Sequence, residues 1–121
     1  MNNEEINTRF NELRTRLKSQ FGRTPGVDAI LFLIGMNELG KGPIEFSRED
    51  KMNLLHIAHC KIFSQSGYYE FEKTDEEGWP HYKVLKQYPS MGLEEQEIFL
   101  KQHILLYFES IGYYENKTTN S

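Results

Sequence analysis

The sequence has 121 residues, enough for one compact domain and too few for two. Charged residues make up 26%, but 13% aromatic residues supply the apolar surface for a core, so the composition excludes a disordered chain. The lone Cys60 excludes an internal disulfide and agrees with a reducing compartment. No apolar run approaches the roughly 18 residues of a membrane span, and the start does not resemble a secretory signal. We therefore expect a cytoplasmic protein with no membrane partner.

The net charge of −4 arises in the second half of the chain. Residues 1–60 carry 8 basic and 8 acidic side chains, whereas residues 61–121 carry 6 and 10. A protein that binds nucleic acid through phosphates usually has a basic face. The basic set near the start is better explained as the solvated face of a helix: Arg9, Arg14, Arg16, Lys18 and Arg23. The charge pattern therefore disfavours nucleic acid as a partner.

Three helices are predicted in the first half of the chain. An apolar residue recurs every three or four positions from Ile6 to Phe21, which predicts a first helix over residues 3–21 that Gly22 ends. Residues 29–36 are apolar on almost every side and predict an enclosed second helix, with Thr24 as its N-cap, Pro25 in its first turn and Gly35 available for close helix contact. Ser47 followed by Asp50 resembles a capping box, which predicts a third helix over residues 47–66.

A hairpin and a fourth helix are predicted in the second half. Residues 68–73 and 81–85 have strand composition and flank an acidic turn in which Gly78 suits a left-handed position. Residues 93–111 predict the fourth helix, with acidic residues at its N-terminal end. Residues 63–70 are echoed by 108–115, which we interpret as one helix-ending solution used twice. Residues 116–121 are predicted to be a disordered tail.

His56, His59 and Cys60 form the most conspicuous group of possible metal ligands. His56 and Cys60 are four residues apart and share a helix face, but zinc needs a third and usually a fourth protein ligand, and no CxxC or HExxH spacing is present. We expect His59 to lie in the core, His56 at its boundary and Cys60 to be a buried thiol, with zinc as the alternative. No cofactor and no catalytic residue are predicted.

The fourth helix carries more apolar residues than one face can hold. We assign its core stripe to Leu93, Leu100, Ile104, Tyr107 and Ile111. Ile98 and Leu105 then project from the opposite side, and Phe99 and Leu106 extend the apolar surface along an edge. We expect replacement of Ile98 and Leu105 by lysine to abolish association without unfolding the chain. The aromatic residues of the hairpin, among them Trp79 and Tyr82, are a second candidate contact surface or a roof over the core.

The order of a third helix and a following hairpin also permits a winged-helix DNA-binding protein. Between residues 70 and 77 one lysine stands against five acidic residues, whereas a wing that faces DNA should be basic. DNA binding is therefore kept as an alternative.

Three short stretches resemble a family of short bacterial proteins to which no activity is assigned. They are His56-Ile57-Ala58-His59-Cys60-Lys61, Gly67-Tyr68-Tyr69-Glu70 and Asp75-Glu76-Glu77-Gly78-Trp79-Pro80-His81. The resemblance covers residues 23–108. It implies a bacterial cytoplasmic protein and carries over no activity, cofactor or catalytic residue.

The expected architecture is mainly α. It is a single helical domain over residues 1–115, with four helices in an antiparallel, bundle-like arrangement and a two-stranded hairpin or ordered loop between the third and fourth. The expected function is that of a non-enzymatic interaction or regulatory module that binds a protein partner or forms a homodimer. Six residues are its candidate contacts: Ile98, Phe99, Leu105, Leu106, Trp79 and Tyr82. A metal- or small-ligand-binding protein that uses His56, His59 and Cys60 is a further alternative.

Overall fold

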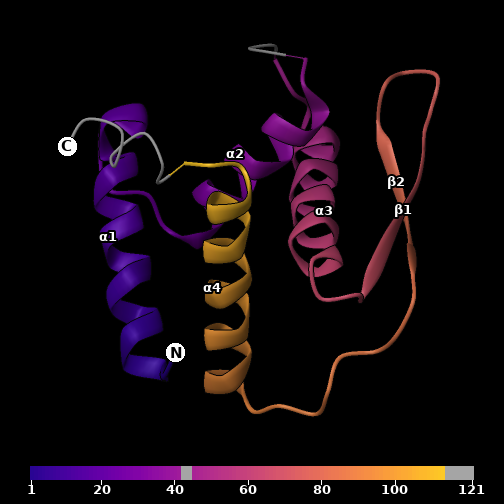
Figure 1. The fold of residues 1–121 in the computed structure, drawn as a ribbon. Helices are drawn as coiled ribbons and strands as arrows, with labels where there is room; N and C mark the ends of the chain where they lie inside the picture. The colour runs from indigo at the N-terminus through magenta and orange to yellow at the C-terminus, as the bar shows by residue number, and fades with distance from the viewer. Residues whose placement is uncertain (42–44, 114–121) are drawn as a thin grey trace. The chain divides into compact units, whose positions relative to one another are not determined.

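The computed structural model describes residues 1–41 and 45–113, and the predicted tail over residues 116–121 lies outside them. The elements are, in chain order, α1 (Asn3–Phe21), α2 (Val27–Leu39), α3 (Arg48–Ser64), β1 (Tyr69–Thr74), β2 (Pro80–Val84) and α4 (Leu93–Ser110) (Figure 1). The mainly helical fold with a hairpin between α3 and α4 is confirmed. No helix among the described residues is long and apolar enough to cross a lipid bilayer.

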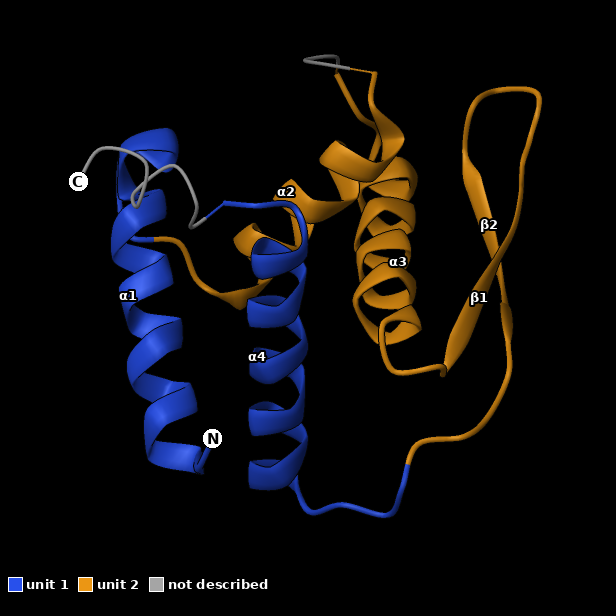
Figure 2. Cartoon of the chain, viewed as in Figure 1, with its two compact units in different colours: residues 1–24, 89–121 blue, residues 25–88 orange. Residues whose placement is uncertain are grey.

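The chain divides into two compact units (Figure 2). Unit 1 contains residues 1–24 and 89–121 and is built on α1 and α4. Unit 2 contains residues 25–88 and is built on α2, α3 and the hairpin.

In unit 1, α1 and α4 run parallel to each other (Figure 1). The ammonium group of Lys101 donates to Asn7 Oδ1 at 3.0 Å and lies 5.4 Å from the ring centre of Phe10. Toward the C-terminal end of both helices, the guanidinium of Arg16 lies 4.7 Å from the ring centre of Tyr113, which follows α4 in the chain. The antiparallel arrangement expected from sequence is therefore wrong for this pair, because the long connection through residues 25–88 can return the chain to the same end.

In unit 2, α3 lies between α2 and the hairpin, so more than one of its sides is buried (Figure 1). Side chains on several sides of this helix are buried: Leu54, Ile57, Ala58, Cys60, Ile62 and Phe63. α2 crosses α3, and Gly35 lies against the backbone of Leu54 at the crossing. A side-chain carbon at position 35 would lie 2.9 Å from the Leu54 carbonyl carbon, so the close contact expected at this glycine is confirmed.

The helix ends show which local signals the sequence carries. Ser47 Oγ accepts from the backbone N–H of Asp50 at 3.0 Å, as the capping pattern predicted. α2 instead begins at Val27 behind an extended Gly26, so the predictions of Thr24 as its N-cap and of Pro25 in its first turn are wrong. A left-handed glycine follows each of two helices: Gly67 follows α3 and Gly112 follows α4. In both places the backbone N–H of the next residue donates a hydrogen bond to a carbonyl in the last helical turn. The sequence echo therefore is one helix-ending motif used twice.

The hairpin pairs β1 and β2 antiparallel, with Phe71 opposite Tyr82 and an irregular register between Phe71 and Lys73. Its turn closes through a bond from the backbone N–H of Asp75 to the carbonyl of Trp79 at 2.9 Å. Gly78 has a φ of 91°, the left-handed conformation that this three-residue turn requires. The predicted hairpin and the predicted role of Gly78 are confirmed.

Candidate functional site

An open groove of about 1070 Å³ runs along unit 1 between α1 and α4, and we call it the α1–α4 groove. Residues of both helices line it, together with Met1: Thr8, Arg9, Asn11, Glu12, Thr15 and Arg16 from α1, and Gln102, Leu105, Leu106 and Glu109 from α4. α4 supplies the two leucine side chains and Glu109, and α1 supplies charged side chains of both signs, Arg9, Glu12 and Arg16. Protein–protein contacts usually combine apolar side chains with polar and charged ones.

Leu105 does not project outward as the sequence analysis expected. It is only 7% exposed, because it lies on the side of α4 that packs against α1. Lys101 contacts Asn7 and Phe10 of α1, and Leu105, four residues later, follows on the same side of the helix. The apolar spacing predicted one buried stripe on α4, whereas side chains on more than one side of this helix are buried. The lysine pair proposed for Ile98 and Leu105 would therefore damage the packing of unit 1.

The other candidate contacts on α4 differ in exposure. Ile98 and Phe99 are half-buried, and Leu106 is 39% exposed beside the groove. The assignment of Leu93 and Ile111 to the core stripe is wrong, because Leu93 is 85% exposed and Ile111 is also exposed. Leu106 is thus the predicted contact residue that is both accessible and part of the groove.

His103 is a buried polar residue of α4 that the sequence analysis did not single out. Its Nδ1 atom lies 2.8 Å from the carbonyl oxygen of Phe99, and the two rings are 4.5 Å apart. Burial lowers the pKa of His103, against the opposing effect of that backbone carbonyl. Its partner within its own helix gives this histidine a structural role.

In unit 2, His59 and Tyr88 are at the centre of an aromatic cluster on α3. His59 Nε2 lies 2.7 Å from Tyr88 Oη, and the Tyr88 side chain is also hydrogen-bonded to Tyr69. The His59 ring packs on Phe63 at 4.7 Å, and the Tyr88 ring lies 4.9 Å from that of Tyr68. Burial, with a smaller effect of His56, lowers the pKa of His59, and burial raises the pKa of Tyr88. These tyrosines cover α3, which agrees with the interpretation of the aromatic residues as a roof over the core.

The candidate metal ligands do not converge. His56 Nε2 lies 3.5 Å from Cys60 Sγ, whereas His59 is hydrogen-bonded to Tyr88. Over residues 1–41 and 45–113, no three His, Cys, Asp or Glu side chains are grouped so that they could hold a metal ion. Cys60 is buried, and burial raises the pKa of its thiol to about 11, which opposes a nucleophilic role.

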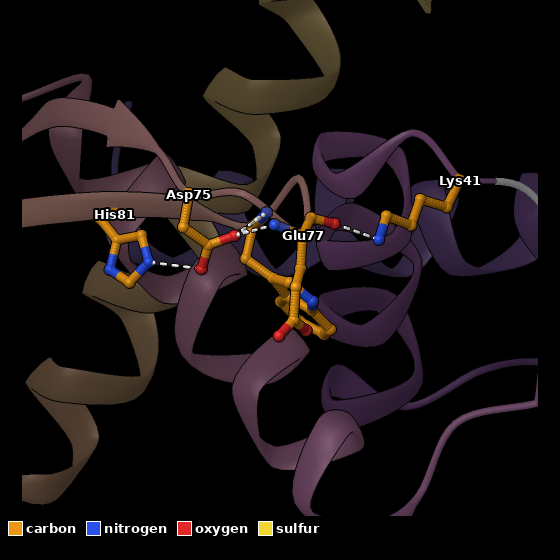
Figure 3. A network of polar contacts seen from close by, with 5 residues as sticks. Lys41, Asp75, Glu77 and His81 are labelled. Carbon is orange, nitrogen blue, oxygen red and sulfur yellow. Dashed lines mark hydrogen bonds and ion pairs between the residues drawn. The ribbon is translucent and has the colours of Figure 1, made fainter.

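The hairpin turn is organised by the carboxylate of Asp75 (Figure 3). Asp75 Oδ1 accepts from the backbone N–H groups of Glu77 at 3.0 Å and Trp79 at 2.9 Å, and Oδ2 lies 2.8 Å from His81 Nε2. The His81 contact and these backbone bonds lower the pKa of Asp75. The side chain of Lys41 donates to the Glu77 carbonyl oxygen (Figure 3). These hydrogen bonds give the polar side chains of the turn a structural role.

The two candidate contact residues of the hairpin, Trp79 and Tyr82, are both half-buried. Tyr82 pairs across the hairpin with Phe71, and the two rings are 5.9 Å apart. Burial, with the nearby Glu38 and Cys60, raises the pKa of Tyr82 to about 12. The half-burial of Tyr82 agrees with the contact between β2 and α3 in unit 2.

Comparisons with protein-family models, with curated proteins and with solved structures found no match to this chain.

Proposed function

We propose that this protein is a non-enzymatic interaction module that binds an α-helix of another polypeptide in the α1–α4 groove. The observation that carries the proposal is an open groove lined by residues of two parallel helices, among them two leucines and charged side chains of both signs (Figure 1). Residues 9–16 of α1 and 102–109 of α4 each extend about 10 Å along the helix axis. An amphipathic helix laid along such a groove can bury its apolar side and pair its flanking charges.

The titratable groups with shifted pKa values support a structural interpretation of unit 2. The lowered pKa of His59 favours its neutral form at pH 7, and the raised pKa of Cys60 keeps its thiol protonated. Neutral groups that are buried, as Cys60 is, or half-buried, as His59 is, and that have partners inside the fold serve packing and hydrogen bonding. In the hairpin, five acidic side chains between residues 70 and 77 oppose contact with DNA phosphates.

Site-specific photo-crosslinking in the cell tests the proposed function. A benzophenone amino acid is placed at Gln102, which is exposed and lines the groove, or at Asn53, an exposed residue of α3. We expect a covalent adduct with a polypeptide from position 102 and none from position 53. The same label at position 102 in a Leu106→Lys background should give at least about tenfold less adduct, because an ammonium group would be buried in the contact.

Circular dichroism of the Leu106→Lys protein controls for folding, which we expect to be unchanged because Leu106 is exposed. Equal adducts from positions 102 and 53 would show nonspecific proximity and contradict the proposal. Adduct formation that Leu106→Lys leaves unchanged would also contradict it.

A further inference from the structure

Four charged side chains of alternating sign follow one face of α1: Glu5, Arg9, Glu12 and Arg16. Their spacings of four, three and four residues keep them on one side of the helix. The first three are exposed and Arg16 is half-buried, and all but Glu5 line the α1–α4 groove. We call this set the α1 charge stripe.

The charges of the α1 charge stripe are complementary to those of a second copy of the stripe that runs in the opposite direction. When two copies of α1 lie antiparallel with a twofold axis between positions 10 and 11, position 9 faces position 12 of the other copy, and position 5 faces position 16. Arg9 then meets Glu12, and Glu5 meets Arg16, each of them twice by symmetry. A twofold contact requires a surface that matches itself in this way.

Position and length also suit such a contact. α1 has 19 residues, and the axis lies close to its middle, so residues 3–18 of one copy overlap residues 18–3 of the other. This overlap extends over about 24 Å of helix. The exposed Leu106 lies in the same groove as the stripe and supplies apolar surface beside the charges.

We propose that the partner in the α1–α4 groove is a second copy of this chain, held through the antiparallel α1 charge stripes. This inference rests on the proposed function and names its partner. Opposite charges at four places set the register, because a shift of the two helices by one turn brings like charges together.

The same four residues can also interact within one helix, and charge exchange separates that effect from dimer formation. In an isolated helix, Arg9→Glu places Glu5 and position 9 in repulsion, and the double variant Arg9→Glu with Glu12→Arg keeps that repulsion. In the proposed dimer the double variant restores every pair between the copies. Recovery in the double variant therefore reports on contact between chains.

Native mass spectrometry and sedimentation velocity of the full chain test the inference with wild type and three variants: Arg9→Glu, Glu12→Arg and the double variant. Wild type and the double variant should form dimers, and each single variant should dimerise at least about tenfold more weakly, because each brings two like-charge pairs together. An equimolar mixture of the two single variants should form a heterodimer, since opposite charges then face each other at positions 9 and 12. The different masses of the variants identify that heterodimer directly.

A monomeric wild type at concentrations up to about 200 μM, where weak specific dimers are populated, would overturn the inference. It would also be overturned if the mixture failed to associate more strongly than its two components. Cellular adducts from position 102 with a different polypeptide, together with a monomeric purified protein, would overturn the second-copy partner and leave the proposed function standing. Absence of any groove adduct would reject the proposed function itself.

Discussion

Gly35 shows how one residue sets the packing of two helices. Elsewhere in a helix, glycine to alanine would stabilise by about 0.5–1 kcal/mol. Here the added carbon would lie 2.9 Å from the carbonyl carbon and 3.1 Å from the Cβ of Leu54, so α2 would have to move away from α3. Forced separation in a packed core costs roughly 1–3 kcal/mol, which outweighs the gain.

We therefore expect Gly35→Ala to lower the free energy of unfolding by about 1–2 kcal/mol in urea denaturation. The exposed Asn37 of the same helix provides a control, and Asn37→Ala should change that free energy by less than about 0.5 kcal/mol. A Gly35→Ala protein as stable as wild type would contradict the close approach of α2 and α3.

His59 predicts how stability depends on pH. Its pKa in the folded state lies below the value of about 6.5 in an unfolded chain. Between these two values the unfolded chain binds more protons, so stability is present above about pH 6.5 and falls as the pH is lowered through the folded pKa.

The expected result is a falling urea midpoint from pH 7 to pH 5, with a flatter profile for His59→Phe. His103 has its pKa lowered in the same direction and should retain part of the slope. Midpoints measured at several pH values provide the check, and a profile that is equally steep without His59 would contradict the assignment.

At the scale of an element, the hairpin depends on the Asp75 carboxylate. Asp75→Ala removes the acceptor for the N–H groups of Glu77 and Trp79 as well as the contact with His81. We expect amide hydrogen exchange at these two N–H groups to accelerate at least about tenfold, with α3 unchanged. Glu76→Ala, an exposed neighbour in the same turn, is the control and should leave exchange near the wild-type rate. Equal protection in the two variants would show that the strands alone hold the turn.

The elements that the sequence predicted well are those with local causes. Ser47 caps α3 because its hydroxyl reaches an N–H three residues away, and Gly78 takes a conformation that other residues rarely adopt. The faces of α4 were predicted poorly. Leu105 is buried and Leu93 exposed because burial depends on which neighbours lie beside a helix, and one apolar stripe does not carry that information.

At the scale of the molecule, the pairing of α1 with α4 could not be predicted from the sequence. The two helices are separated by the whole of unit 2 along the chain and run parallel, whereas short loops would have favoured antiparallel neighbours. The α1 charge stripe was present in the sequence from the start. That the stripe is accessible and borders the α1–α4 groove follows only from the folded structure.

Leucine methyl NMR of the purified full chain tests most directly the claim that a second copy of this chain binds in the α1–α4 groove. Leu106 lines the groove, whereas Leu93 is 85% exposed on the same helix and is not among the lining residues. As the protein is concentrated from about 10 to 200 μM, the range in which a weak dimer forms, the Leu106 methyl signals should shift and those of Leu93 should stay in place. Movement of Leu93 with a stationary Leu106, or no movement of either, would contradict the binding of a second copy in this groove.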